Sequence, residues 1–241
     1  MLSDRTEVLS YVIDLCHKNL AHDEVAYRYL TVTRNLSDES IKTFKLGSFP
    51  QSTKELAKNV DVEVLKELKI AWLSQFSGDG PCKFRDSYNL ITPIYDTYGI
   101  PIAISGRFLG PEASRKTLGL HKYDNSDYSK HSNLFGMHLA KPHILQKDKV
   151  LVVEGQFDVI KAHQHGIKNV VATAGAFLKL EQLAILARYT KNIYLGFDND
   201  EAGTLAINRS LTLKRTGIEL IEKRVPSQFK DLDEYLDKKA A

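Results

Sequence analysis

The sequence predicts an α/β protein in which a parallel sheet of βαβ units follows a smaller α+β region. From residue 150 onward, short apolar runs alternate with helical patterns, as expected of buried strands covered by helices on both faces. Upstream, apolar residues keep a helical spacing to about residue 75, and two β-prone runs follow. We therefore expect two domains: residues 1–146, helical over 1–75 and β-containing and basic over 77–146, and residues 147–241.

The first region is expected to open with several helices. One helix is predicted over residues 5–20, because apolar residues recur there at the 3.6-residue spacing of a single face: Val8, Leu9, Val12, Ile13 and Cys16. A second covers 22–31, a third begins near Ser37, and one or two more span 56–68. The runs LITPIYD and IPIAISGRF, separated by Thr97-Tyr98-Gly99, then predict a hairpin, and the polar residues 110–133 predict an excursion across a surface.

The second region alternates strands and helices. Strands are predicted at VLVVE, NVVATA, NIYLGFD and IELIEKRV, with a helix after each of them. Such alternation indicates parallel strands joined by helical crossovers.

Composition excludes several classes of protein. The chain has 241 residues, 43% of them hydrophobic, and no apolar run long enough to span a bilayer. Its N-terminus lacks the pattern of a secretory signal, so we expect a cytoplasmic protein without a membrane partner. Cys16 and Cys82 are its only cysteines, too few for a cysteine-rich zinc site or a disulfide framework, so we expect no zinc.

Charge is informative through its distribution. The net charge is only +3, but residues 105–149 hold eight Lys and Arg side chains against four acidic ones. Such a stretch indicates either a solvated basic face or a surface for nucleic acid, and charge alone leaves both readings open.

Acidic residues cluster where predicted strands end. Glu154-Gly155 ends VLVVE, with Asp158 one turn into the next helix, and the Asp198-Asn199-Asp200 triplet ends NIYLGFD. A third pair follows IELIEKRV after a short loop: Asp231 and Asp233. Ligands of an open parallel sheet bind at the carboxyl ends of its strands, so these side chains are expected to converge.

Converging carboxylates repel one another unless a cation neutralises them. Their oxygens are ligands that Mg²⁺ and similar hard cations prefer, and Gly155 and Gly203 would let the backbone approach closely. For a single aspartate, helix capping is an equally good explanation, and it applies best to Asp200 and Asp231. Three clusters at successive strand ends favour a metal site.

These residues carry a resemblance. The run EGQFDVIKAHQHGIKNVVATAGA, followed by GFDNDEAG, is similar to a TOPRIM domain, the fold shared by bacterial-type primases, topoisomerases and some nucleases. In that family an acidic Glu-Gly is followed shortly by an Asp and then by Asp-x-Asp about 45 residues on, which Glu154, Asp158, Asp198 and Asp200 match.

The upstream half resembles one branch of that family. The segments TPIYDTYGIPIAISGRFLG, HKYDNSDYSKHSNLFGMHLAK and YLTVTRNLSDESIKTFKLG are similar to parts of the RNA polymerase domain of DnaG-type primases, so the resemblance covers nearly the whole chain. It implies synthesis of short RNA primers on single-stranded DNA, in which a 3′-hydroxyl attacks the α-phosphate of a ribonucleoside triphosphate. Metal ions, Mg²⁺ or Mn²⁺ and two or more of them, would lower the hydroxyl's pKa and bridge phosphate oxygens.

The resemblance also implies roles for particular residues. The principal catalytic and metal-holding groups would be Glu154, Asp198 and Asp200, although Glu154 could instead relay a proton. Second-rank ligands or orienting groups would be Asp158, Asp231 and Asp233. Candidates for binding nucleotide or template are Arg107, Lys122, Tyr123 and Asn125, since Arg and Lys suit phosphates and Tyr can stack on a base.

The chain departs from the family pattern at a few positions. Where the family often has an Arg before the Pro-Ile strand, this chain has Asn89, and Lys83 or Arg85 could substitute for it. The middle residue of Asp-x-Asp is Asn199, where Gly is common, and the third cluster reads Lys-Asp-Leu-Asp rather than Asp-Pro-Asp.

Partners and rival functions follow from the same comparison. The chain has no residues assignable to the zinc-binding or helicase-interacting modules of DnaG-type primases, so a zinc-module protein or replicative helicase is expected in trans, in a bacterial or phage-infected cell. The alternatives are a Mg²⁺-dependent TOPRIM nuclease and a non-catalytic module that docks to a replication complex.

Overall fold

The computed structural model describes residues 1–240, and its contacts divide the chain into two compact units. The first contains residues 1–94 and 100–128, and the second contains residues 95–99 and the chain from 129 onward. The division by contacts therefore lies near residue 128 rather than at 146, because helix α8 (Met137–Lys147) buries Met137, Ala140 and Ile144 in the core of the second unit.

Helices make up most of residues 1–75, as predicted. Helix α1 (Arg5–Asn19) begins where the Asp4 side chain accepts hydrogen bonds from the backbone N–H groups of Thr6 and Glu7, and it buries the predicted apolar face. The expected helix over 22–31 is α2 (Glu24–Arg28) continued by a π-helical turn, Tyr29–Thr33. The remaining helices are short: α3 (Asp38–Thr43), α4 (Lys54–Asn59), α5 (Val62–Glu67) and α6 (Lys83–Asp86).

An antiparallel sheet completes the first unit. Its order is β1 (Gly47–Ser48), β2 (Leu90–Tyr95), β3 (Pro101–Arg107) and β4 (Tyr123–Asn125), so the predicted hairpin is present as β2 and β3. The segment 110–133 is more regular than expected of a surface excursion. It contains α7 (Glu112–Thr117) and strand β4, which pairs with β3. One edge of β3 faces β2, and β4 supplies hydrogen-bond partners for the backbone groups on the other edge of β3.

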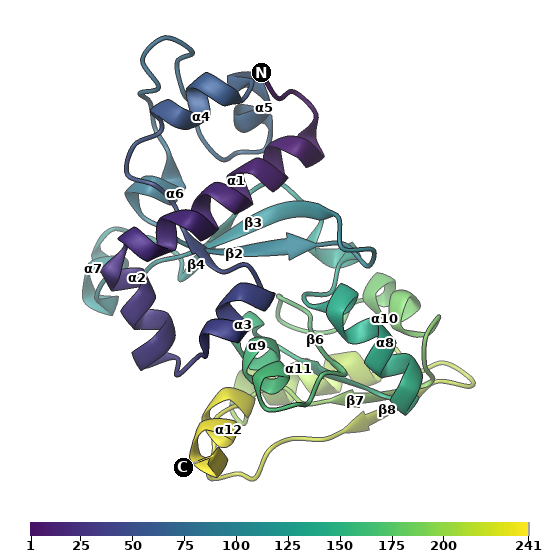
Figure 1. The fold of residues 1–241 in the computed structure, drawn as a ribbon. Coiled ribbons are helices and arrows are strands. Elements are labelled where there is room, and N and C mark those ends of the chain that lie inside the picture. The colour runs from purple at the N-terminus through teal and green to yellow at the C-terminus, as the bar shows by residue number, and fades with distance from the viewer. Residues whose placement is uncertain (241) are drawn as a thin grey trace. The chain divides into compact units, whose positions relative to one another are not determined.

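The second unit is built on a parallel sheet of order β6 (Val170–Ala172), β5 (Val150–Val153), β7 (Asn192–Leu195) and β8 (Glu219–Glu222). Besides α8, the helices α9 (Gln156–Gln164), α10 (Leu180–Leu186), α11 (Glu201–Leu211) and α12 (Leu232–Ala240) surround it (Figure 1). The α/β class predicted from the alternating pattern is therefore confirmed.

No helix within residues 1–240 combines the length and apolar character needed to cross a bilayer.

Candidate metal centre and nucleotide-binding surface

The acidic residues follow the ends of neighbouring strands. Strand β5 ends at Val153, directly before Glu154, and β7 ends three residues before Asp198. The two strands are parallel partners with Val152 opposite Leu195, and β8 pairs with the other side of β7. Because carboxyl ends of parallel strands meet at one edge of a sheet, all three acidic clusters start from the same edge.

Asp158 and Asp233 are the two buried members of the group, and Asp158 makes hydrogen bonds to two helix starts. Its Oδ2 accepts the backbone N–H of Gly155 (3.2 Å) and its Oδ1 accepts that of Asp233 (3.1 Å), so this carboxylate ties the start of α9 to the start of α12. Burial, and then the nearby carboxylates of Asp231, Asp198 and Asp233, raise the pKa of Asp158 to about 7. The acidic groups therefore act on one another electrostatically.

Asp200 and Asp231 both cap helices. Asp200 Oδ1 accepts the N–H of Gly203 (2.8 Å) at the start of α11, and Asp231 Oδ1 accepts the N–H of Glu234 (2.9 Å) at the start of α12. The capping explanation raised by the sequence therefore holds for both residues. A carboxylate has two oxygens, so a cap made by one does not prevent the other from binding a cation.

A lysine ammonium lies where two of the carboxylates face each other. Lys230 Nζ is 3.8 Å from Asp198 Oδ2 and 3.8 Å from Asp231 Oδ2. These two aspartates, 33 residues apart, thus converge on one positive charge. The ammonium is largely exposed, so a more highly charged cation could displace it.

Asn199 fixes the loop that carries Lys230. Its side-chain Nδ2 lies within hydrogen-bonding distance of the carbonyls of Val225 (3.1 Å), Pro226 (3.2 Å) and Phe229 (2.8 Å), and its backbone N–H donates to the carbonyl of Lys230 (2.7 Å). The middle residue of Asp-x-Asp therefore positions the loop before Asp231. Sequence reasoning noted Asn199 only as a departure from the usual glycine.

The donor chemistry of this edge fits a hard divalent cation. The groups are carboxylates, and two of them already share a cation in Lys230. Within residues 1–240, no three His, Cys, Asp or Glu side chains are arranged to hold a metal ion as they stand.

Arg107 and Tyr123 form the centre of the predicted nucleotide-binding group. They lie directly opposite each other on β3 and β4, and Arg107 Nη1 donates to the Tyr123 hydroxyl. The guanidinium carbon of Arg107 lies 4.9 Å from the ring centroid of Tyr123 and 5.1 Å from that of Tyr29. Burial raises the pKa of the Tyr123 hydroxyl, while the charge of Arg107 opposes that rise.

Sequence reasoning missed Tyr29 and its neighbour Arg34. Arg34 Nε donates to the Tyr29 hydroxyl (2.8 Å), and the Arg34 guanidinium lies 5.6 Å from the Tyr29 ring centroid. The π-helical turn aligns them, because the N–H of Arg34 bonds to the carbonyl of Tyr29 five residues earlier (2.9 Å). The YLTVTR string carried no recognisable signal for a π turn.

The other candidate binding residues have partners of their own within the first unit. Lys83 Nζ donates to the Asn125 carbonyl (2.6 Å) and pairs with Asp124 (3.1 Å), so Lys83 and Asn125 are brought together. Lys122 Nζ lies 5.9 Å from the centroid of the Tyr123 ring. Arg85 is held by its neighbour Asp86 (2.7 Å) and by the Gly80 carbonyl (3.0 Å).

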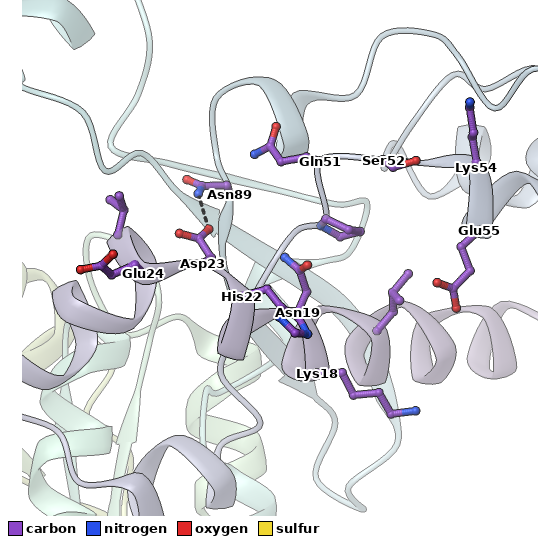
Figure 2. A pocket seen from close by; sticks show the side chains of 13 residues that line it. Lys18, Asn19, His22, Asp23, Glu24, Gln51, Ser52, Lys54, Glu55 and Asn89 are labelled. Atoms are coloured by element: carbon purple, nitrogen blue, oxygen red, sulfur yellow. Dashed lines mark hydrogen bonds between the residues drawn. The ribbon is translucent and has the colours of Figure 1, made fainter.

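Asn89 lines a groove in the first unit, beside α1 and the segment 50–55 (Figure 2). Its Nδ2 donates to Asp23 Oδ2 (3.0 Å), and the Ser48 hydroxyl donates to the same oxygen. Among the described residues that line this groove, neither Lys83 nor Arg85 occurs. Their substitution for the arginine that the family has at this position stays a prediction.

The fold and the acidic edge define a protein with a TOPRIM-type sheet, and residues 151–236 match the family model described as Toprim-like. Residues 15–141 match the model of the DNA primase catalytic core, N-terminal domain. The chain belongs to the DNA primase catalytic core family.

Curated relatives agree with that assignment. The chain is similar to the DNA primase of Aquifex aeolicus, with 31% identity over 95% of this chain and 45% of the relative. It is also similar to the DNA primase of Enterococcus faecalis, with 32% identity over 96% of this chain and 38% of the relative. The chain spans less than half the length of these relatives.

Solved structures give the same picture. The zinc-binding and RNA polymerase domains of Aquifex aeolicus primase match with a TM-score of 0.84 and 30% identity, over 97% of this chain and 57% of that one. A DnaG catalytic core matches with a TM-score of 0.79 and 25% identity, over 98% of this chain and 76% of that one. A TOPRIM domain in a primase core indicates use of a divalent metal.

Proposed function

We propose that this chain is the catalytic core of a DNA primase that makes short RNA primers on single-stranded DNA by metal-dependent nucleotidyl transfer. The observation that carries the proposal is the pairing of two matches in one chain, to the N-terminal domain of the primase core and to a Toprim-like domain. The Toprim-like match alone would fit a nuclease equally well. The match to the N-terminal domain of the primase core favours primer synthesis.

Glu154, Asp198 and Asp200 would hold the metal, with Asp158, Asp231 and Asp233 as further ligands or orienting groups. Bound Mg²⁺ or Mn²⁺ would activate the attacking hydroxyl and neutralise charge on the phosphates. The chain's own residues would orient the reactants. Arg107, whose guanidinium lies over two tyrosine rings, would bind phosphate groups of the nucleotide, and Lys122 and Lys83 would add positive charge.

Incorporation of labelled ribonucleotides on single-stranded DNA templates of varied sequence, with Mg²⁺ and Mn²⁺ in turn, tests the proposal. We expect short RNA products that depend on both template and metal. Metal-dependent cleavage of the template without RNA synthesis would favour the nuclease. Neither activity, with DNA binding retained, would favour a docking module.

We expect Arg107→Lys to raise the KM for ribonucleotides by about tenfold or more with a smaller effect on kcat. Lysine keeps the charge but lacks the planar guanidinium that stacks on Tyr29 and Tyr123 and binds phosphate with two N–H groups. Steady-state incorporation kinetics measure the effect. Arg5→Lys, at an exposed arginine of the same unit, is the control, and an equal KM for the two variants would contradict the role of Arg107.

The partners and cellular setting are further parts of the proposal. The Aquifex structure contains both a zinc-binding domain and an RNA polymerase domain. We propose that this chain works with a zinc-binding module and a replicative helicase in the cytoplasm of a bacterial or phage-infected cell, without zinc in the residues described here.

A further inference from the structure

Lys161 is a charged residue with no exposed surface. It lies on α9, three residues after Asp158, and its side chain is 0% exposed. Lysine is almost never fully buried unless its ammonium is paired, because removing the charge from water is costly. Neither the metal site nor the nucleotide-binding group predicted from the sequence includes this residue.

The Lys161 ammonium pairs with two aspartates of α12. Asp237 Oδ1 lies 2.6 Å away and Asp233 Oδ1 lies 3.6 Å away. The two aspartates are four residues apart, so they lie on the same face of the helix. The Asp233 side chain is 10% exposed and the Asp237 side chain 33%, so Asp233 is the partner that water screens less.

Asp233 also connects Lys161 to the acidic edge. Its backbone N–H donates to Asp158 Oδ1 (3.1 Å), while its carboxylate pairs with Lys161. Asp158 and Lys161 lie three residues apart on α9 and so share one face of that helix. Helix α9 therefore contacts Asp233 at two points, through Asp158 and through Lys161.

We propose that Lys161 is a positioning residue whose ammonium is the permanent cationic partner of Asp233, one of the two aspartates of the third acidic cluster. It neutralises Asp233, so Asp233 orients the start of α12 and does not bind the metal. The divalent cation is left to the carboxylates of the first two clusters and Asp231. This inference rests on the proposed metal-dependent function.

The proposal predicts an effect on metal affinity with a definite sign. Lys161→Met removes a fixed positive charge near the acidic edge and breaks the ion pair between that charge and the Asp233 carboxylate. Less repulsion and one more available carboxylate should tighten the binding of a divalent cation. We expect the Kd for Mn²⁺ to fall about tenfold, with a larger rise in Tm on adding Mn²⁺ than in the unmodified protein.

The experiment measures Mn²⁺ binding to the full chain by calorimetry and by the spin-resonance signal of free Mn²⁺. Because removing one partner of a buried pair is destabilising, Lys161→Met/Asp237→Asn is measured alongside, since it restores charge balance and keeps Asp233 ionised. We expect the same fall in Kd. The matched control is Lys168→Met, which removes an exposed lysine and should change the Kd less than twofold.

Asp233→Asn separates the two roles of Asp233. If Asp233 orients and does not ligate, the Kd for Mn²⁺ should change less than threefold, whereas Asp198→Asn should raise it at least tenfold. Equal weakening by the two variants would make Asp233 a ligand and overturn the proposal. So would a Kd that is unchanged or higher in both Lys161 variants, which is the result expected of a purely structural ion pair.

The readout is independent of primer synthesis. Mn²⁺ binding that follows the expected pattern without any ribonucleotide incorporation would refute the proposed function and leave the role of Lys161 standing. Absence of Mn²⁺ binding from the unmodified protein and from every variant would overturn the role of Lys161.

Discussion

Asp198→Asn is expected to lower ribonucleotide incorporation at least about 100-fold without loss of thermal stability. Asp198 and Asp231 converge on the Lys230 ammonium, where we propose that the divalent cation binds, so an amide at residue 198 would remove a charged ligand from that site. The loss should appear in kcat and in the concentration of Mg²⁺ needed for half-maximal activity.

Stability should move in the opposite direction. The Asp198 carboxylate contributes to raising the pKa of the buried Asp158, so its removal relieves repulsion in the metal-free protein. We therefore expect an unchanged or higher Tm in the absence of metal. Glu219→Gln is the matched control, because Glu219 is exposed at the amino end of β8, the opposite edge of the sheet from the site. Activity of Asp198→Asn within threefold of that control would rule out the site assignment.

Gly203→Ala is expected to destabilise the protein by about 3 kcal/mol, which is roughly a 10 °C fall in Tm for a chain of this length. Gly203 lies in the first turn of α11, and a Cβ there would be 2.0 Å from the carbonyl oxygen of Asp198, 2.9 Å from its carbonyl carbon and 3.0 Å from its nitrogen. These are backbone atoms, so no side-chain rotation relieves the clash. The helix or the Asp198 segment has to move.

The sign of this effect is diagnostic. Glycine to alanine inside a helix ordinarily stabilises by up to about 1 kcal/mol, because alanine has the higher helix propensity. A loss of stability in Gly203→Ala therefore indicates that the backbone at Gly203 packs closely against the backbone of Asp198. We expect the affinity for Mn²⁺ to fall together with the stability. Gly175→Ala is the control, since the nearest atom to its added Cβ, the Thr173 carbonyl oxygen, is 3.8 Å away. Thermal unfolding of Gly203→Ala and Gly175→Ala tests this prediction, and equal Tm values for the two variants would contradict the predicted clash.

Much of the fold follows from local patterns. The spacing of apolar residues predicts the apolar face of α1, the β2–β3 hairpin and the alternation of strands and helices after residue 150. Helix α8 was not predicted, because Pro142 interrupts its pattern and only packing against the sheet decides which unit it joins.

The sequence by itself also determined where the carboxylates lie, since residues after buried parallel strands reach one edge of a sheet whatever else packs around it. Only the tertiary structure decided which cations they meet. Lys161 meets Asp237 across 76 residues and Lys230 meets Asp198 across 32, while Arg107 meets Tyr123 through the register of β4. Such contacts depend on how helix faces and strand registers fit together, and the periodicity of a single segment carries no information about its partner.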